Sequence, residues 1–156
     1  MANVNYVKEG TQVDATKDSV IVRKHIAGLA GGRALDLTGY TAKEIPCGLP
    51  IITDGNGTYK PLAPADTTVE SVTTYGFTLP DGYSYAGICG ASVLAGKGVS
   101  VVTAAVINET AMVANITEKF PSSMTTPNAL SLSAIKSALP HIIWESDEAY
   151  DAPSNN

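Results

Sequence analysis

Charged residues are scarce in this chain, at 16% of its 156 residues, and no segment gathers positive charge. The formal net charge is −5 at pH 7, which argues against nucleic acid as a partner because nucleic-acid-binding surfaces are basic. No apolar run approaches the roughly 18–20 residues that a membrane-spanning helix needs. The N-terminus, MANVNYVKEG, lacks the basic-then-apolar pattern of a signal peptide. We therefore expect no nucleic-acid or membrane partner, and synthesis and use without secretion.

Cysteine is nearly absent, with Cys47 and Cys89 far apart in the sequence. A free cysteine commonly behaves as a small buried hydrophobic residue. We expect this of both, rather than a disulfide or a nucleophile.

Residue types that carry chemistry do not cluster in the sequence. The candidate ligand carboxylates lie on separate turn-like segments without ligand spacing: Asp36, Glu44 and Asp54. His25 and His141 are expected at a surface or an interface. The glycine-rich segments 27–33 and 96–98 lack the Gly-Lys-Ser/Thr ending and the following helix of a phosphate-binding loop. We predict no catalytic residue, no cofactor and no metal, and hence no enzyme.

The longest β-branched apolar run, VSVVTAAVI at 99–107, predicts a strand with two mostly apolar faces. Such a strand is covered on both sides, in a core or at a subunit contact. Its candidate trimer or core contacts are Val99, Val101, Val102 and Val106. Residues 85–94 predict a second strand, and the glycines at 96–98 permit a tight reversal between the two. We expect this hairpin to be the centre of the domain.

Further strands are predicted at 19–26, 49–53 and 141–144, and less clearly within 67–79. Pro50 should start its strand or place it at a sheet edge. The sequence DGNG at 54–57 is the strongest hairpin signal in the chain.

Two helical segments are expected near the C-terminal half. Asn108 can cap a short helical turn. Thr126 and Pro127 suit the start of a helix whose buried face carries Leu132, Ile135 and Leu139, ending at a proline. The fold class is therefore mostly β (a β-rich α+β protein). We expect a compact barrel-like or sandwich domain with one short C-terminal helix.

The chain divides into a flexible N-terminal arm at 1–18, a β-rich domain at 19–145 and an acidic tail at 146–156, which we expect to be disordered. The arm alternates enough for a strand, but no nearby segment closes it into a hairpin. Such an arm is either disordered or ordered by a partner.

Several short segments together resemble one family. They are LDLTGY at 35–40, IITDGNGTYKPL at 51–62, AGI at 86–88, VSVV at 99–102 and VINE at 106–109, followed by a short helix and a terminal strand. This order is similar to that of the head-decoration (capsid cement) proteins of tailed bacteriophages, of the lambda type. The likeness covers about residues 19–145, and its motifs describe turns and strands rather than chemistry. The chain departs from the lambda-type pattern in a longer segment between Tyr59 and Pro80 and in its acidic tail.

The resemblance implies a structural protein made in the bacterial cytoplasm and placed on the outer surface of the virion capsid. It would sit as a homotrimer over three-fold positions of the expanded head and tie subunits of the major capsid protein together. The N-terminal arm could add a strand to a neighbouring sheet, with Val4, Tyr6 and Val7 as candidate capsid-binding anchors. Three arms on one trimer would add avidity. A merely disordered terminus is the equal alternative.

Other functions stay open: a head-fibre base, a host- or carbohydrate-binding module displayed on the virion, or, less favoured, a trimeric β-rich enzyme. Exposed tyrosines gathered on one face would favour the carbohydrate-binding module, and their burial at a three-fold axis would favour the decoration protein. The residues concerned are Tyr40, Tyr59, Tyr75 and Tyr83.

Overall fold

A computed structural model of the chain describes residues 13–123 and 130–146. Strands occupy 38% and helices 16%, which confirms the predicted mostly β fold. The strands are β1 (Val22–Gly28), β2 (Glu44–Ile45), β3 (Pro50–Thr53), β4 (Tyr59–Pro61), β5 (Ala65–Val69), β6 (Val72–Gly76), β7 (Ser84–Cys89), β8 (Val93–Leu94), β9 (Val101–Asn108) and β10 (Ile142–Glu145). The helices are α1 (Asp18–Ile21), α2 (Glu109–Lys119) and α3 (Ser133–Ala138). None of these helices is long and apolar enough to cross a membrane.

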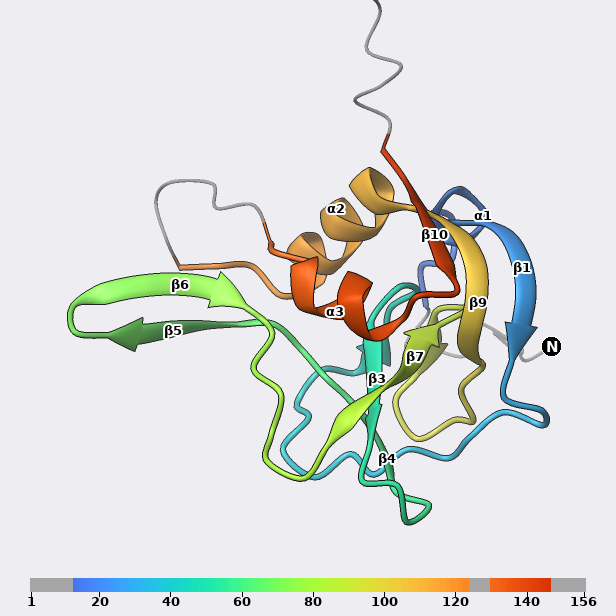
Figure 1. The fold of residues 1–156 in the computed structure, drawn as a ribbon, viewed down its shortest axis with the longest axis horizontal. Coiled ribbons are helices and arrows are strands. Elements are labelled where there is room, and N and C mark those ends of the chain that lie inside the picture. The colour runs from blue at the N-terminus through green and yellow to red at the C-terminus, as the bar shows by residue number, and fades with distance from the viewer. Residues whose placement is uncertain (1–12, 124–129, 147–156) are drawn as a thin grey trace, which may run out of the picture.

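Strand β9 is the centre of a six-stranded sheet of order β1-β9-β7-β3-β4 (Figure 1). Strand β1 pairs antiparallel along one side of β9. On the other side, β10 pairs parallel with residues 105–108, and β7 pairs antiparallel with Val101 and Val102. The strand order is that of an open sheet, with residues of α2 and α3 packed into its core.

The core joins β9 to α2 and α3. Its fully buried members include Val101 and Ile107 from β9, Met112 and Ile116 from α2, and Ile135 from α3. Leu132 and Leu139 are also buried, as the helical spacing predicts. Burial of such side chains contributes roughly 1.5–3 kcal/mol each relative to exposure, so the core around β9 supplies much of the stability of the fold.

The central hairpin differs from its prediction. Strand β7 ends at Cys89, and residues 93–94 turn aside to pair with β2 rather than with β9. The Ser92 hydroxyl and amide both donate to the Asp18 carboxylate at 2.7 Å, which holds this loop against α1. The predicted strand at 85–94 was therefore too long. The chain between β7 and β9 is a loop that contains the short strand β8, instead of a tight turn.

Helices depart from the prediction in three places. Segment 19–26 begins with the single turn of α1, so its strand starts at Val22. Asn108 does cap a helix, accepting from the Ala111 amide at 3.1 Å, but α2 runs for 11 residues rather than one turn. Helix α3 begins only at Ser133, and the predicted cap at residues 126–127 lies outside the described residues.

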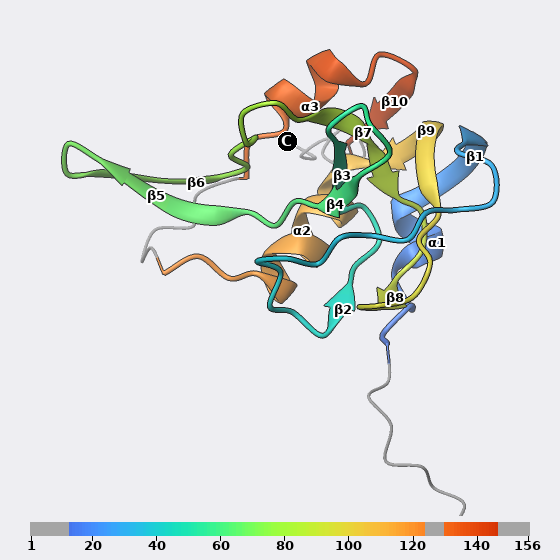
Figure 2. The same cartoon turned by 90° about the horizontal axis from the view of Figure 1, so that it is seen from below.

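Other predicted strands are confirmed. Pro50 starts β3, and the DGNG turn joins β3 to β4, although β3 lies between β4 and β7 rather than at an edge. The segment at 67–79 contains most of a second hairpin, β5–β6. This hairpin projects from the body of the molecule in both views, and its strands pair only with each other (Figures 1 and 2).

Residues 13–18, which the sequence assigns to the arm, lie against the domain. Lys17 forms an ion pair with Glu118 of α2, and Asp18 holds Ser92. Residues 1–12 and 147–156 lie outside the described residues.

Candidate functional site

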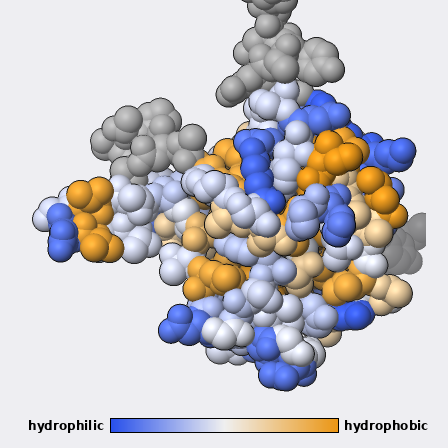
Figure 3. Space-filling view, viewed as in Figure 1, coloured by the Kyte–Doolittle hydropathy of each residue, from blue (hydrophilic) through white to orange (hydrophobic). Residues whose placement is uncertain are grey.

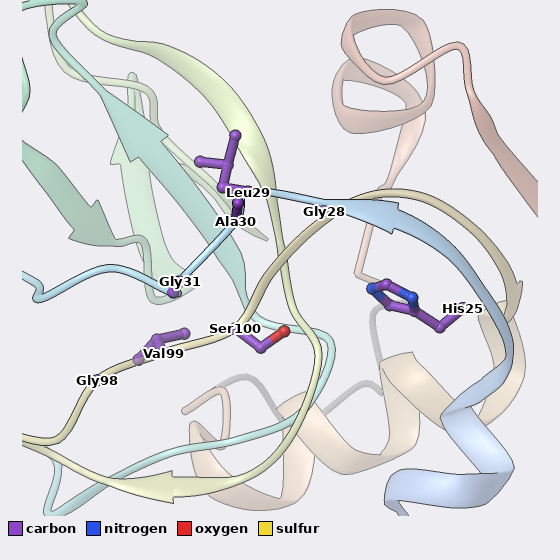
Figure 4. Close-up of a pocket in the computed structure, with 9 residues that line it drawn as sticks. His25, Gly28, Leu29, Ala30, Gly31, Gly98, Val99 and Ser100 are labelled. Atoms are coloured by element: carbon purple, nitrogen blue, oxygen red, sulfur yellow. The ribbon is translucent and has the colours of Figure 1, made fainter.

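An open hollow of about 470 Å³ lies where β1 ends (Figure 4). It is lined by His25, by residues 28–32 of the glycine-rich loop, and by residues 98–100. The two segments are joined by their main chains: the Leu29 amide donates to the Val101 carbonyl, and the Arg33 amide to the Val99 carbonyl. A Cβ on Gly28 would come within 2.6 Å of the Val101 carbonyl oxygen, so this close approach requires glycine.

The chemistry that this hollow offers is limited. His25 is the one titratable side chain among its lining residues, and no carboxylate or thiol lines it. The nearby Arg33 guanidinium is engaged with the carbonyls of Ala30 and Gly32, at 2.9 and 2.7 Å. A general base needs a reacting partner or an orienting group within hydrogen-bond reach, and none of the lining side chains supplies one.

The carboxylates named from the sequence each hold local structure. Asp36 accepts from the Thr38 amide and hydroxyl, and these bonds hold the pKa of its carboxyl below the usual value. Glu44 pairs with Lys119 at 2.6 Å. The Asn56 amide lowers the pKa of Asp54 in the same way, within the β3–β4 turn. In residues 13–123 and 130–146, no three His, Cys, Asp or Glu side chains are grouped to hold a metal.

Both cysteines are buried and free, as predicted. The Cys47 thiol donates to the Gly90 carbonyl and the Cys89 thiol to the Ala91 carbonyl. Burial raises the pKa of Cys47 and raises the pKa of Cys89 to about 12. Both thiols are therefore protonated at neutral pH and are poor nucleophiles.

The four tyrosines do not form an exposed platform. Tyr75 is buried, and its hydroxyl donates to the Phe120 carbonyl. Tyr40 is half-buried and donates to the Glu44 carbonyl. Tyr59 and Tyr83, also half-buried, lie under cationic side chains, with Arg33 5.4 Å and Lys60 5.5 Å from the respective ring centres. The arrangement that would favour a carbohydrate-binding face is absent for these residues.

The four valines named from the sequence separate into two groups. Val99, Val101 and Val102 are buried within a single chain. Val106 is half-buried and lies opposite Ile143 of β10 on one side and Lys24 of β1 on the other. Two-sided apolar character in β9 is thus largely satisfied within one chain, and of these four valines only Val106 remains available to a subunit contact. The arm residues Val4, Tyr6 and Val7 lie outside the described residues.

The sequence analysis did not predict two exposed apolar surfaces. One, which we call the outer face, consists of exposed or half-buried apolar residues of β1, β9 and β10: Ile26, Ala27, Ala104, Val106 and Ile143. The other, the hairpin tip, consists of residues 69–72 between β5 and β6, with Val69 65% and Val72 64% exposed. Figure 3 shows apolar surface in both regions, at opposite ends of the molecule. The pairing of β10 with β9, which completes the outer face, has no local sequence signal.

Comparison with protein-family models, with curated proteins and with solved structures finds no match to this chain. Functional argument therefore depends on the residues and surfaces described above.

Proposed function

We propose that this chain is an auxiliary structural protein of a tailed-phage head, a cement protein that binds the outer capsid surface as a homotrimer. The observation that supports this most directly is the distribution of exposed apolar surface. It lies on the outer face of β1, β9 and β10 and on the projecting hairpin rather than inside a cleft. A protein that binds other proteins needs such surfaces, whereas a small-molecule site is concave and carries convergent polar groups. The resemblance to decoration proteins supplies the identity of the partner, a major capsid protein.

Capsid attachment is assigned to residues 1–12 and occurs by strand addition. Main-chain hydrogen bonds provide the affinity in this mode, and alternate side chains select the partner. The alternation of Val4 and Tyr6 along the segment suits it. Residues 13–18 are excluded from this role because Lys17 and Asp18 bond to the folded domain.

The test is co-sedimentation with purified expanded heads of the phage concerned. A chain that lacks residues 1–12 keeps Lys17 and Asp18, so its melting temperature should be nearly unchanged. Its head binding should fall by orders of magnitude, because three arms act together. Val7→Pro should act like the deletion, since proline removes a main-chain donor, while Val7→Thr is the matched control that keeps the amide. Undiminished head binding by the truncated chain would refute the arm assignment. Absence of head binding by the full chain would refute the function.

A head-fibre base remains the second candidate, and it predicts that a further virion protein co-purifies with the head-bound chain. A carbohydrate-binding role and a trimeric enzyme have less support, since none of the four tyrosines is fully exposed and the hollow at β1 offers one imidazole.

A further inference from the structure

The hairpin tip presents two apolar side chains side by side in solvent. Val69 and Val72 are directly paired across the β5–β6 ladder, with Glu70 and Ser71 forming the turn between them. In Figures 1 and 2 this end lies farther from the body of the molecule than any other labelled strand. An exposed pair of large apolar residues at the end of a projection has no structural role within its own chain, and it is typical of an interaction surface.

Bonds at its base hold this projection in a defined direction. The Tyr75 hydroxyl donates to the Phe120 carbonyl. Asp66 accepts from the Ser122 hydroxyl at 2.5 Å and from the Ser123 amide at 2.7 Å. Thr68 and Thr73 share a hydroxyl hydrogen bond of 2.8 Å across the ladder. The tip is therefore presented by an ordered element, which reduces the entropy lost on docking.

The outer face offers an apolar acceptor at the opposite end of the molecule. Val106 lies between Ile143 and Lys24 in one cross-strand row, and Ala104 lies opposite Ala27 in the next. The two alanines are the small members of this face, whose larger exposed side chains are Ile143 at 55% and Ile26 at 53%. Small side chains flanked by larger apolar ones form a shallow seat for protruding apolar groups.

Charge is complementary between the two surfaces. The hairpin tip carries Glu70, and the outer face is bordered by Lys24 of β1, which lies opposite Val106. Neither Glu70 nor Lys24 forms an ion pair with any described residue. A docked tip would place the Glu70 carboxylate beside the Lys24 ammonium, which fixes register and disfavours other orientations.

We propose that the hairpin tip of one chain docks on the outer face of a second copy of this chain, head to tail. Because the two surfaces lie at opposite ends of the molecule, one chain cannot satisfy its own tip, and each copy presents a further tip. Contacts of this heterologous kind close into a ring when the rotation from copy to copy completes a circle, and otherwise extend into a filament. Each contact is small, but closure gives every chain two contacts and strengthens the assembly. The docking itself is independent of the proposed function. The number of copies in the ring, three, rests on it.

The experiment is sedimentation velocity over a concentration series on the full chain, without phage heads. Wild type should form a closed oligomer. The double variant Val69→Ser/Val72→Ser should associate at least about tenfold more weakly, because apolar anchors dominate small interfaces. Leu79→Ser, at another exposed apolar residue, is the matched control and should associate as wild type does. A monomeric wild type, or unchanged association of the double variant, would overturn the proposal.

Mixing two variants tests the head-to-tail arrangement. The tip variant keeps an intact outer face, and Ile143→Ser keeps an intact tip, so an equimolar mixture should give heterodimers and stop there. Likewise Glu70→Lys and Lys24→Glu should each weaken association, and the chain carrying both should recover it. Homodimers of the tip variant, or no recovery in the double charge variant, would contradict docking of the tip on this face. Failure of head binding leaves these results untouched, and so separates this inference from the capsid function.

Discussion

Strand β9 and the β5–β6 hairpin both contain β-branched residues, mostly valine in β9 and mostly threonine in the hairpin, yet they have opposite environments. Strand β9 has strands on both sides and helices over its core-facing residues, so Val101, Val102, Ala105 and Ile107 are fully buried. The hairpin strands pair only with each other, and most of their residues are exposed. Both segments form strands, and their position relative to the sheet decides which side chains are covered.

The difference separates stability from recognition. Removing apolar atoms from β9 leaves a cavity in a packed interior. Removing them from the hairpin tip creates no cavity, because water already surrounds those side chains. Changes that alter the first region should lower the free energy of unfolding. Changes in the second should alter association and leave the fold intact.

The largest expected effect is in β9. Ile107→Ala should lower the free energy of unfolding by about 2–5 kcal/mol, because Ile107 is fully buried between Val22 and Trp144. Val69→Ala at the hairpin tip should change it by no more than about 0.5 kcal/mol when measured on the monomer. Urea unfolding followed by circular dichroism gives both values. Equal losses at the two positions would show that the hairpin belongs to the cooperative core.

A smaller loss is expected at the junction of the two regions. Tyr75 is buried at the hairpin base, and Tyr75→Phe removes only the hydrogen bond to the Phe120 carbonyl. The free energy of unfolding should fall by about 1 kcal/mol. Tyr85→Phe is the matched control, since Tyr85 is half-buried and its hydroxyl has no partner among the described residues. A loss of the same size in both variants would mean that the Phe120 bond contributes nothing specific.

Much of this arrangement follows from the sequence, and particular residues show why the rest does not. The β-branched run at 99–107 and the DGNG turn have strong local signals; the DGNG turn was predicted correctly, and the strand was too, although β9 begins two residues later, at Val101. Helix α2 was underestimated because Val113, Ile116 and Thr117 favour strands, and its stability comes from packing against β9. Residues 93–94 pair with β2 instead of β9 because Ser92 hydrogen-bonds to Asp18, and these two residues lie 74 positions apart in the sequence.

The candidate interaction surfaces were the least predictable part. Glu70 and Ser71 lack the glycine or asparagine that marks a two-residue hairpin turn, so the hairpin gave only a weak signal. The outer face depends on β10 pairing in parallel with β9, which no local pattern specifies.

Acid should loosen the hairpin before the core. Hydrogen bonds from Ser122 and Ser123 lower the pKa of Asp66 below its usual 3.8, so the folded state favours the ionised carboxylate. This contribution is complete above the unfolded value and is lost as pH falls below 3.8 through the lowered pKa. Hydrogen exchange of the β5–β6 amides should therefore lose protection at pH 3 relative to pH 5, after correction for intrinsic rates. Asp66→Asn should remove this pH dependence, and persistence of the dependence in the variant would assign it to another group.

The smallest expected effect is a gain within the hairpin turn. Glu70 and Ser71 have φ values of 48° and 67°, the left-handed region that costs ordinary residues roughly 1 kcal/mol each relative to glycine or asparagine. Glu70→Asn with Ser71→Gly should relieve this strain and stabilise the local ladder by up to about 1 kcal/mol, seen as slower hydrogen exchange in β5 and β6. The global melting temperature should hardly change, because the hairpin adds little to the core. The control is Glu70→Ala with Ser71→Ala, which removes the same side chains and keeps the strain. If the control slowed exchange as much as the Asn-Gly variant, the effect would come from the lost charge rather than the backbone. If the Asn-Gly variant raised the melting temperature as much as the local stability, the hairpin would unfold together with β9.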